Sequence, residues 1–535
     1  MSVYNTVTIT RPKRAGHNLS HNVRTDARIG ELFLISRPIE CVPGDTMKLG
    51  NISEVQLAPM VSPSKGQLDY ETFCFFVSND MLKASSDSDT FTNILSSMLD
   101  ESPKALPLSV SSTPVELRSY AEQMGIPAGF VAAGKNLLLY PLRSIVKIYN
   151  DWIRDENLQS EIPLNGISNY VIKANRFHIN YKKNRITSAF TSPQKGKDLR
   201  MPIGNYAPIV LVNDSVHWLG DAGQSNSHTI AINVGTQPVN LPIALVNGTN
   251  TDDQIDAANS RISNALTSQL QADLRQVTGV SIDDLRLYNK LQKWEERNQL
   301  YGSRPKEFLL GNYGIAPNDE VLDRPVLIGH TRTPVIISNV TANIESSNTS
   351  TAFSGFQGSK AGNGSSNSRY YYGKWLCKEF GWIITLGCLR PRYQHVGGVH
   401  PSLIKSNVYD FFNSIFQTLG QVPIKQGEVF GLSDNFNSIF GYTDPYNELR
   451  GLEDMTTGVL TDSSLESWSI NRKYASDQTP ASVIEVNPSD YDYLFEVQSI
   501  TLGNGDSIPA PHAIIESQMV VKAVRPVSKY PHHTL

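Results

Sequence analysis

The sequence predicts a mainly β protein, an antiparallel β-sandwich whose short strands are joined by long loops that carry helices. Its 30 prolines and 37 glycines are scattered over 535 residues, which favours many loops over long helical bundles. Segments rich in β-branched and aromatic residues are short, and long polar stretches separate them. Short strands with long structured connections suit a jelly roll, because loops can grow at the ends of its two sheets.

Strand segments recur along the chain. Residues 42–49 predict a turn at Pro43-Gly44 followed by a strand. In residues 67–77, Asp69 and Glu71 alternate with apolar positions before the segment becomes wholly apolar, as in a strand passing from the rim of a sheet into the core. Further strands are predicted at 228–235, 378–393 and 516–530.

Helices are predicted between the strands. In residues 142–157, Ile145, Ile148, Tyr149 and Trp152 recur at helical spacing opposite a polar side. Residues 281–302 predict the strongest helix, with a capping-box pattern at its start and Gly302 at its end. Shorter helices are predicted at 91–99 and 252–276 and within 440–450, and the low-complexity residues 345–368 predict a mobile loop.

The chain is predicted to form one domain, residues 1–535, with two distinct parts. Residues 1–30 form a basic N-terminal arm, in which 11–28 hold five Lys or Arg against Asp26 alone. Residues 205–279 differ from both flanks in being rich in Asn, Gly, Thr and Ser, which predicts an insertion with a small structure of its own. The alternative is an ordinary surface insertion.

Charge and hydropathy limit the possible functions. A net charge of −4 argues against a dedicated nucleic-acid condenser, although a second basic cluster lies at 181–185. Such clusters are solvated surface unless both face one enclosed nucleic acid. No apolar run approaches the roughly 18 residues of a membrane-spanning helix, and the N-terminus lacks the apolar core of a secretory signal. We therefore expect a protein made in a cytoplasm, without membrane insertion.

Catalytic and metal-binding motifs are absent from the sequence. It contains no G-x-S-x-G, P-loop or H-E-x-x-H pattern. Cys377, Cys388 and His395 fit no zinc spacing, the four cysteines form no disulfide framework, and Cys74 within TFCFFV is expected to be a small buried hydrophobe. Asp490 and Asp492 could bind a cation, but solvent-facing positions at the start of a strand are the simpler interpretation. We predict neither an enzyme nor a cofactor.

Seven blocks, in the same order, resemble the major capsid proteins of the Microviridae, the small single-stranded DNA phages, and in particular the gokushovirus-like branch. The most specific is IVKIYNDWIRDENL at 145–158, which is similar to the family's Y-x-x-I-x-N-x-W-x-R-D-x-N-L helix. Pro305 departs from the family, which usually has an aromatic residue there, and 205–279 and 345–368 match no block. The other blocks lie at 17–49, 58–77, 188–196, 284–315, 379–393 and 440–450.

The resemblance implies a viral jelly roll whose copies assemble, through pentamers, into a T=1 icosahedral shell of 60 subunits around a circular single-stranded DNA genome. It implies a virion protein that is assembled in the cytoplasm of a bacterial host. Its implied partners are other copies of the chain, the packaged DNA, a small basic DNA-binding protein, a scaffolding protein and a host-cell receptor. Insertion 205–279 would form a protrusion at the threefold axes and serve host attachment.

Three groups of residues are candidates for these roles. The DNA-facing candidates are Arg11, Lys13, Arg14, Lys182, Lys183 and Arg185. The candidates for subunit interfaces, where burial inside one subunit is the alternative, are Tyr149, Trp152, Ile153, Leu285, Tyr288 and Trp294. The host-attachment candidates in the insertion are His217, Trp218, His228 and Asn247.

A carbohydrate-binding jelly-roll protein is the alternative function, since that sandwich also carries many lectins and hydrolases. It would need an aromatic platform with a carboxylate pair or a calcium cluster. The sequence offers no clustered Asp/Glu motif of that kind.

Overall fold

The computed structural model divides the chain into two compact units. The first comprises Met1–Lys195 and Glu296–Leu535, and the second Gly196–Glu295. The structure describes residues 14–97, 104–109, 112–132, 135, 137–165, 171–196, 209–211, 227–234, 237–244, 270–272, 282–301, 304–315, 318–341, 360–418, 420–474, 476–503 and 505–529.

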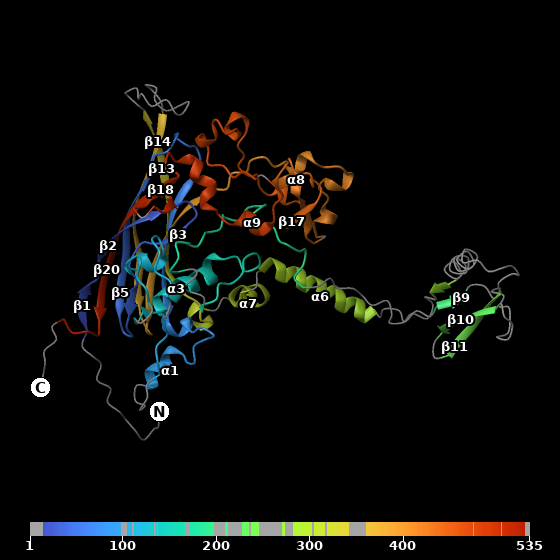
Figure 1. Ribbon diagram of the computed structural model, residues 1–535, viewed down its shortest axis with the longest axis horizontal. Helices are drawn as coiled ribbons and strands as arrows, with labels where there is room; N and C mark the ends of the chain where they lie inside the picture. Colours follow the sequence, from blue (N-terminus) through green and yellow to red (C-terminus); the bar gives the residue numbers. More distant parts are fainter. Residues whose placement is uncertain are drawn as a thin grey trace, which may run out of the picture. The chain divides into compact units, whose positions relative to one another are not determined.

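A ten-stranded antiparallel sheet forms the framework of the first unit (Figure 1). Its hydrogen-bonded order is β1-β20-β5-β14-β13-β6-β15-β3, with β2 also pairing with β20 and β4 with β15. The strands are β1 (Ala15–Asn18), β2 (His21–Ala27), β3 (Leu32–Leu34), β4 (Ile39–Cys41), β5 (Thr46–Leu57), β6 (Leu68–Ser78), β13 (Val326–Thr341), β14 (Lys360–Leu376), β15 (Gly381–Pro391) and β20 (Ala513–Arg525).

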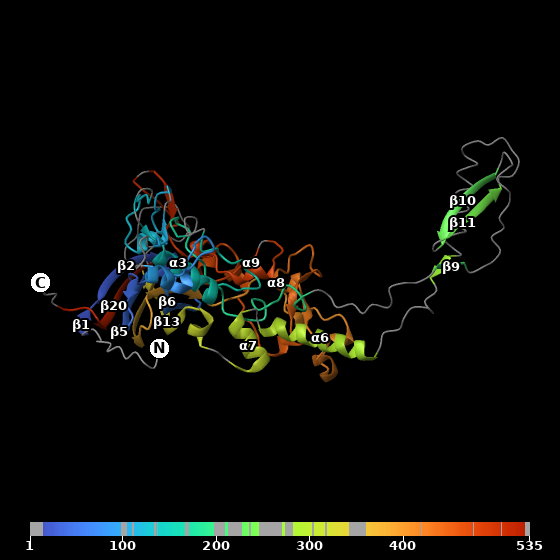
Figure 2. The ribbon, with the colours of Figure 1, turned by 90° about the horizontal axis from the view of Figure 1, so that it is seen from below.

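Strand β13 joins the two halves of this curled sheet. Its residues 326–335 pair with β6, and its residues 336–341 pair with β14. One half thus contains β1, β20, β5 and β14, of which β1, β20 and β5 lie side by side in Figure 2, and the other contains β6, β15, β3 and β4. The mainly β prediction is confirmed, with the two layers joined through one long strand.

A buried apolar cluster fills the space between the halves. Met47 on β5 and Met519 on β20 meet Phe76 on β6 and Ile383 on β15, all at most 5% exposed. Along residues 47–49 of β5 and 519–523 of β20, alternation directs every second side chain into this cluster and the intervening ones outward. The arrangement is that of a sandwich interior.

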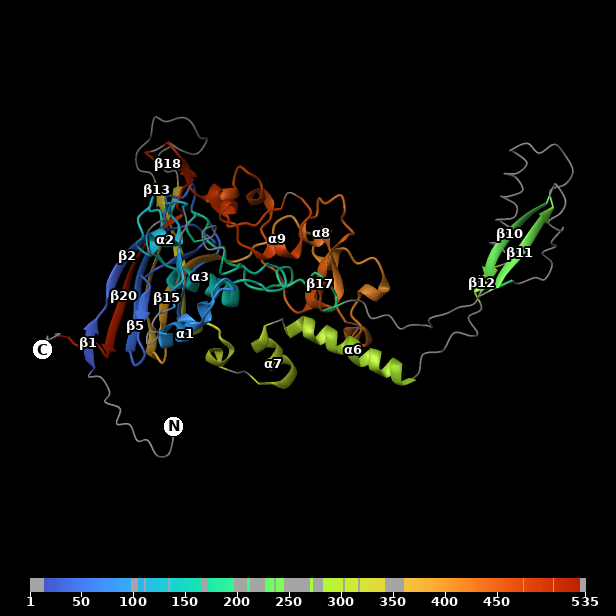
Figure 3. The same cartoon turned by 60° about the horizontal axis from the view of Figure 1, so that its bottom comes forward.

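A larger apolar cluster connects the sheet to helices and loops. Helix α3 buries Leu142, Ile145, Val146 and Ile148, as its helical spacing predicts. Helix α2 contacts β3, and α3 contacts β15 (Figure 3). The helices are α1 (Phe91–Ser96), α2 (Tyr120–Gln123), α3 (Tyr140–Ile148) continued by the π-helical turn η3 (Tyr149–Ile153), α6 (Ile282–Tyr301), α7 (Pro305–Tyr313), α8 (Gln426–Val429) and α9 (Pro480–Ile484).

Short 3₁₀ turns and small hairpins make up the remaining regular structure of the described ranges. The turns are η1 (Asn79–Leu82), η5 (Asp319–Leu322), η6 (Pro401–Leu403), η7 (Val408–Asp410), η8 (Ser414–Thr418), η9 (Asn447–Leu449), η10 (Gly458–Thr461), η11 (Glu466–Trp468) and η12 (Pro488–Leu494). The paired strands of the first unit are β7 (Leu108–Ser109) with β8 (Leu137–Leu138), β16 (Val422–Lys425) with β17 (Ile439–Thr443), and β18 (Ser499–Thr501) with β19 (Ser507–Pro509).

The second unit contains two antiparallel pairs. These are β9 (Ile209–Leu211) with β12 (Leu270–Ala272), and β10 (Ser227–Val234) with β11 (Gln237–Ala244). The prediction of a helix throughout 252–276 is wrong at 270–272, because these residues pair with β9; residues 252–269 lie outside the described part. The predicted strand at 228–235 is confirmed as β10.

The predicted mobile loop at 345–368 is wrong from residue 360 onward, where β14 begins. The Gly- and Ser-rich composition suggests a loop, but glycine is required at two positions of β14 because neighbouring segments pack closely against them. A Cβ on Gly362 would lie 2.6 Å from the carbonyl oxygen of Ser62, and one on Gly364 would lie 2.3 Å from the Leu57 side chain. Glycine at these positions therefore allows neighbouring segments of the chain to approach closely, and it does not indicate mobility.

The other predicted elements are confirmed: the strands β5, β6, β15 and β20, and the helices α1, α3 and α6. The rim position predicted for Asp69 and Glu71 is wrong, since both are only 3% exposed. Within the described ranges, every helix is too short or too polar to cross a lipid bilayer.

Candidate functional site

A cavity of about 580 Å³ in the first unit gathers basic side chains from distant parts of the chain. It opens between the strands β6, β13 and β15 and two loop segments, 182–188 and 447–454. The basic residues that line it are Lys182, Lys183, Arg185, Arg332, Arg390, Arg392 and Arg450, and the acidic ones are Asp69, Glu453 and Asp454.

Strand register places the first of these charges. Arg332 on β13 lies opposite Glu71 on β6, and Arg390 on β15 lies opposite Asp69. The ion pairs run diagonally: Arg332 binds Asp69, and Arg390 Nε lies 3.0 Å from Glu71 Oε2. Lys182 Nζ adds a contact of 3.1 Å to Glu71. Cross-strand pairs of opposite charge stabilise such a sheet modestly and fix its register.

Several cations of the cavity are more exposed than the acids that hold them. The side chains of Asp69 and Glu71 are 4% exposed, whereas those of Lys182 and Arg332 are 48% and 42% exposed. Arg392, which pairs with Asp454 at 2.6 Å, is 56% exposed. Asp69 and Glu71 therefore lie beneath, and the surface above them presents ammonium and guanidinium groups to solvent.

The three candidates at 182–185 have different environments. Lys183 pairs with Asp155 at 2.6 Å and remains 58% exposed. Arg185 is 8% exposed and pairs with Glu428 and Glu453, at 2.5 and 2.9 Å. Burial alone would lower the pKa of Arg185, but these two carboxylates raise it above its ordinary value. Arg185 is thus largely neutralised inside its own subunit, and the more exposed Lys182 and Lys183 are better placed to meet a ligand.

Of the arm candidates, only Arg14 is described, and it does not line the cavity. Arg14 is exposed and immediately precedes β1, and Arg11 and Lys13 lie outside the described residues.

A concave, cation-lined surface of this kind suits phosphate groups. Arginine presents several N–H donors that match phosphate oxygens, and lysine adds compact positive charge. Tyr393, whose side chain is buried, also lines the cavity. Among the described residues, no group of three His, Cys, Asp or Glu is arranged to hold a metal ion.

Sequence analysis found three of the cavity's seven basic residues and missed Arg332, Arg390, Arg392 and Arg450. One local signal was present: Arg390 and Arg392 are two positions apart at the end of a predicted strand, so they share a face. Arg332 is brought in by the long-range pairing of β13 with β6, which no local pattern reveals, whereas the ion pair of Arg450 is local, with Asp444.

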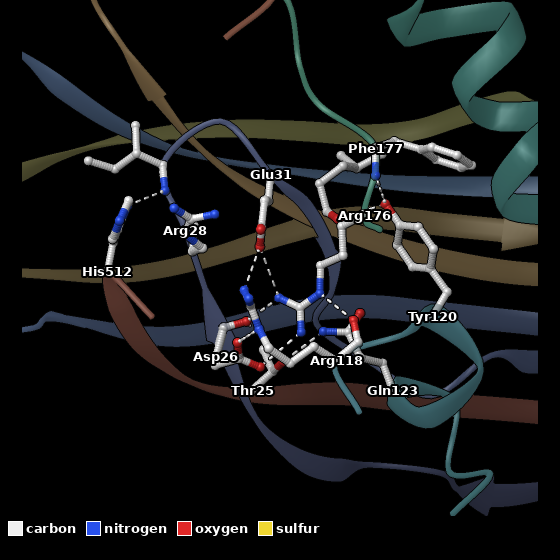
Figure 4. Close-up of polar contacts among 12 residues, drawn as sticks. Thr25, Asp26, Arg28, Glu31, Arg118, Tyr120, Gln123, Arg176, Phe177 and His512 are labelled. Atoms are coloured by element: carbon white, nitrogen blue, oxygen red, sulfur yellow. Dashed lines mark hydrogen bonds and ion pairs between the residues drawn. The ribbon is translucent and has the colours of Figure 1, made fainter. Parts of the chain in front are cut away.

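A second polar cluster fastens the segment between β2 and β3 to two distant loops (Figure 4). Arg118 and Arg176 both bridge Asp26 and Glu31. Arg176 Nε also donates to the Arg118 carbonyl at 2.9 Å, and its Nη1 to the Asp26 carbonyl at 2.7 Å. Burial would raise the pKa of Asp26, yet the two guanidinium groups hold it below its usual value.

The backbone of Arg118 is part of the same arrangement. Its φ of 66° is uncommon for a residue other than glycine. The strain is held by the ion pairs of its own side chain and by the bond from Arg176. Tyr120, two residues on, donates to the Leu32 carbonyl at 2.7 Å and accepts from the Phe177 N–H at 3.0 Å. The cluster is structural, since its charges satisfy one another.

Arg28 and Asp492 extend this cluster towards β20. Arg28 Nη2 lies 2.6 Å from Asp492 Oδ1, and Asp490 pairs with Arg472. The strand predicted to start at Asp490 and Asp492 is wrong, because both residues lie in the 3₁₀ turn η12. Their side chains remain 32% and 25% exposed and pair with buried arginines. His512 completes the group: its Nδ1 accepts from the Ile29 N–H at 3.1 Å, and its Nε2 donates to Asp492 at 2.7 Å.

This geometry predicts a loss of stability on mild acidification. Burial lowers the pKa of His512 from its ordinary 6.5, and the nearby Arg28 lowers it further. Asp492 and Glu31 act in the opposite direction, but they do not cancel the effect of burial. As the pH falls, His512 is therefore protonated in the unfolded chain before it is protonated in the folded one. The free energy of unfolding decreases as the pH drops through about 6.5. In urea unfolding at pH 7.5 and 5.5, the pH dependence should be weaker in His512→Gln than in the wild type. If the stability of both proteins depended equally on pH, His512 would not be the group responsible for the loss.

The first group of interface candidates packs inside its own subunit. Tyr149 is 8% exposed and stacks on Phe177 at 4.5 Å. The Trp152 indole N–H donates to the Pro325 carbonyl at 2.8 Å, and its ring lies 5.4 Å from that of Phe75. Ile153 is partly buried against the same core. A contact of these three with a neighbouring subunit stays a prediction.

The second group, on α6, is more open. Leu285 and Trp294 are 48% and 50% exposed, and Tyr288 is partly buried. Of the host-attachment candidates, His217, Trp218 and Asn247 lie outside the described residues. His228 belongs to β10, where its backbone pairs with Ile243.

The curled sheet and the helix-bearing loops place the chain among β-sandwich proteins. Comparison with known families makes this specific: residues 4–530 match the capsid protein (F protein) family. The chain belongs to this family, in agreement with its resemblance to the gokushovirus-like Microviridae.

Three relatives, each a capsid protein VP1, support the assignment. That of Spiroplasma virus 4 is 24% identical over 506 residues, covering 89% of this chain and 88% of the relative. That of Bdellovibrio phage phiMH2K is 27% identical over 416 residues, covering 73% and 72%. That of Chlamydia phage 1 is 24% identical over 544 residues, covering 87% of both. The protein is a structural capsid protein of the virion.

Proposed function

We propose that the chain is the repeating subunit of a closed T=1 icosahedral shell of 60 copies, assembled through pentamers, that encloses a circular single-stranded DNA genome. The observation that carries this proposal is the match of almost the whole chain, residues 4–530, to the capsid family. The function is structural and includes no catalytic step. Assembly takes place in the bacterial cytoplasm, with a scaffolding protein as partner.

The basic cavity is the proposed contact with the packaged DNA. Its exposed cations Lys182, Lys183, Arg392 and Arg450 would bind phosphates, and the largely buried acids Glu71 and Asp155 would hold the two lysines in place. Phosphate contacts of this kind carry no sequence information, as a shell around one long genome requires. Since the net charge of the subunit is −4, a small basic DNA-binding protein supplies the remaining neutralisation.

Binding of a single-stranded oligonucleotide tests this contact. In Arg392→Gln/Arg450→Gln, two exposed cations are removed whose partners, Asp454 and Asp444, are themselves exposed. Each lost phosphate contact reduces the slope of log K against log salt by about 0.7, so the slope should fall by about 1.4. Fluorescence anisotropy over a range of salt concentrations measures it.

Lys48→Gln/Lys522→Gln is the matched control, because it removes two exposed cations from neighbouring positions on β5 and β20, outside the cavity. Its slope should equal that of the wild type. If both double variants lose the same slope, binding is diffuse and the cavity is not the DNA contact.

The predicted insertion at 205–279 falls within the second unit, Gly196–Glu295. We propose that this insertion forms the protrusion at the threefold axes and attaches to a host-cell receptor. The candidate residues for attachment are His217, Trp218, His228 and Asn247. Two observations support this assignment: the composition of 205–279 differs from that of both flanks, and these residues fall within the second compact unit.

A further inference from the structure

Large apolar side chains are concentrated on the surface of residues 403–415. Over so short a segment six of them are more than half exposed, which is unusual for a folded chain that stays alone in water. We call them the apolar ridge: Leu403 (79% exposed), Val408 (84%), Tyr409 (77%), Phe411 (62%), Phe412 (58%) and Ile415 (76%).

Polar contacts hold the ridge in this outward conformation. The Asp410 carboxylate accepts from the N–H groups of Ser406 and Asn407, at 2.8 and 2.9 Å. The hydroxyl of Tyr446 accepts from the Asn413 N–H at 3.2 Å, and its ring lies 5.1 Å from that of Phe412. The exposed side chains thus belong to a built surface and are not the result of a missing local contact.

A hollow of about 510 Å³ adjoins the ridge. Tyr409 belongs to both, and Ile404, Phe416, Pro423 and Tyr446 line the hollow with further apolar surface. The hollow is also lined by charged residues, among them Arg185, Lys425 and Glu428. An apolar ridge thus adjoins a recess of mixed character, and stable protein interfaces likewise combine an apolar core with a polar rim.

The size of the ridge fits a stable interface. With a full side-chain area near 200 Å² for residues of this size, its six members expose on the order of 800–900 Å². A standard protein interface buries about 800 Å² from each partner. Monomeric proteins rarely expose more than a few hundred Å² in one patch.

The charge of the segment indicates the kind of partner. Residues 401–418 contain one cation, Lys405, and one anion, Asp410, so the segment is neutral. A DNA-binding surface would be cationic, as the basic cavity is. The chain belongs to a family of capsid proteins, whose copies surround one another, and a neutral aromatic surface suits such a protein partner.

We infer that a second copy of this chain covers the apolar ridge, so that residues 403–415 form a contact between subunits. This inference rests on the proposed function, assembly into a shell, and adds the surface at which the copies meet. Desolvation of Phe411 and Phe412 would supply much of the contact energy, since aromatic anchors dominate such interfaces.

Thiol labelling of Val408→Cys tests whether the ridge is covered. The four native cysteines are buried, so the introduced thiol is the accessible one. It should react freely with a maleimide in dissociated subunits and at least tenfold more slowly in intact particles. Urea dissociation of the same particles should restore labelling, which controls for oxidation. An equal rate in particles and subunits would overturn the inference.

A charge substitution provides a second test. Phe411→Asp/Phe412→Asp should abolish particle formation, measured by sedimentation, while the circular dichroism of the subunit stays unchanged. The matched control, Phe411→Leu/Phe412→Leu, keeps the surface apolar and should still assemble. If the Asp variant assembles like the wild type, the ridge inference fails and the shell proposal stands. If the wild type forms no particles under any condition, both fail. If the Asp variant does not fold, the labelling result decides.

Discussion

Replacing Arg176 with alanine should destabilise the subunit by about 3–5 kcal/mol, because it leaves buried carboxylates without their partner. The Arg176 side chain is 1% exposed and binds both Asp26 and Glu31. Its loss leaves Arg118 to neutralise two acids, and removes the donors to the carbonyl groups of Asp26 and Arg118. Urea unfolding followed by circular dichroism measures the change.

Arg24→Ala is the matched control for this variant. Arg24 also forms an ion pair with a carboxylate, Glu516 at 3.1 Å, but its side chain is 76% exposed. Exposed ion pairs are screened by water and contribute little, so unfolding should be almost unchanged. If the two variants lost the same small amount of stability, the buried network would have no special structural role.

Trp152→Ala should lower subunit stability by about 3 kcal/mol, through lost packing and an unpaired carbonyl. The indole packs against Phe75, stacks under the Arg324 guanidinium at 4.0 Å and donates to the Pro325 carbonyl. Trp152→Phe keeps much of the packing and should lose about 1 kcal/mol, the usual contribution of one hydrogen bond. Thermal or urea unfolding of dissociated subunits measures both.

Trp294→Ala is the comparison on α6. Trp294 is 50% exposed, so its removal should leave unfolding of the dissociated subunit within about 0.5 kcal/mol of the wild type. If Trp294 contacts a neighbouring subunit, assembly should weaken in this variant. A large loss of subunit stability at Trp294 and none at Trp152 would reverse the two assignments.

The elements that could be predicted from sequence are those whose pattern is local. β6 alternates and then becomes apolar, β15 is a nearly continuous apolar run, β20 alternates, and α3 and α6 have helical spacing. β14 could not be predicted, because the glycines that let Leu57 and Ser62 approach resemble those of a flexible loop. The curl of the sheet through β13 also depends on long-range pairing with both β6 and β14.

Charged residues were the least predictable feature. Arg28 was grouped with the basic arm, yet it is buried against Asp492, nearly the full length of the chain away. Asp26 and Glu31, in the block 17–49 that resembles the capsid family, form ion pairs with Arg118 and Arg176 and so have a structural role. A local run of charge shows neither the depth of a side chain nor its distant partner.

The central claim, that this chain builds a closed shell, is tested most directly by sedimentation of the purified protein with negative-stain electron microscopy of each peak. We expect pentamers or closed particles of uniform size, with the chain alone or after co-expression with its scaffolding partner. A monomer that persists at high concentration in both conditions would contradict the account.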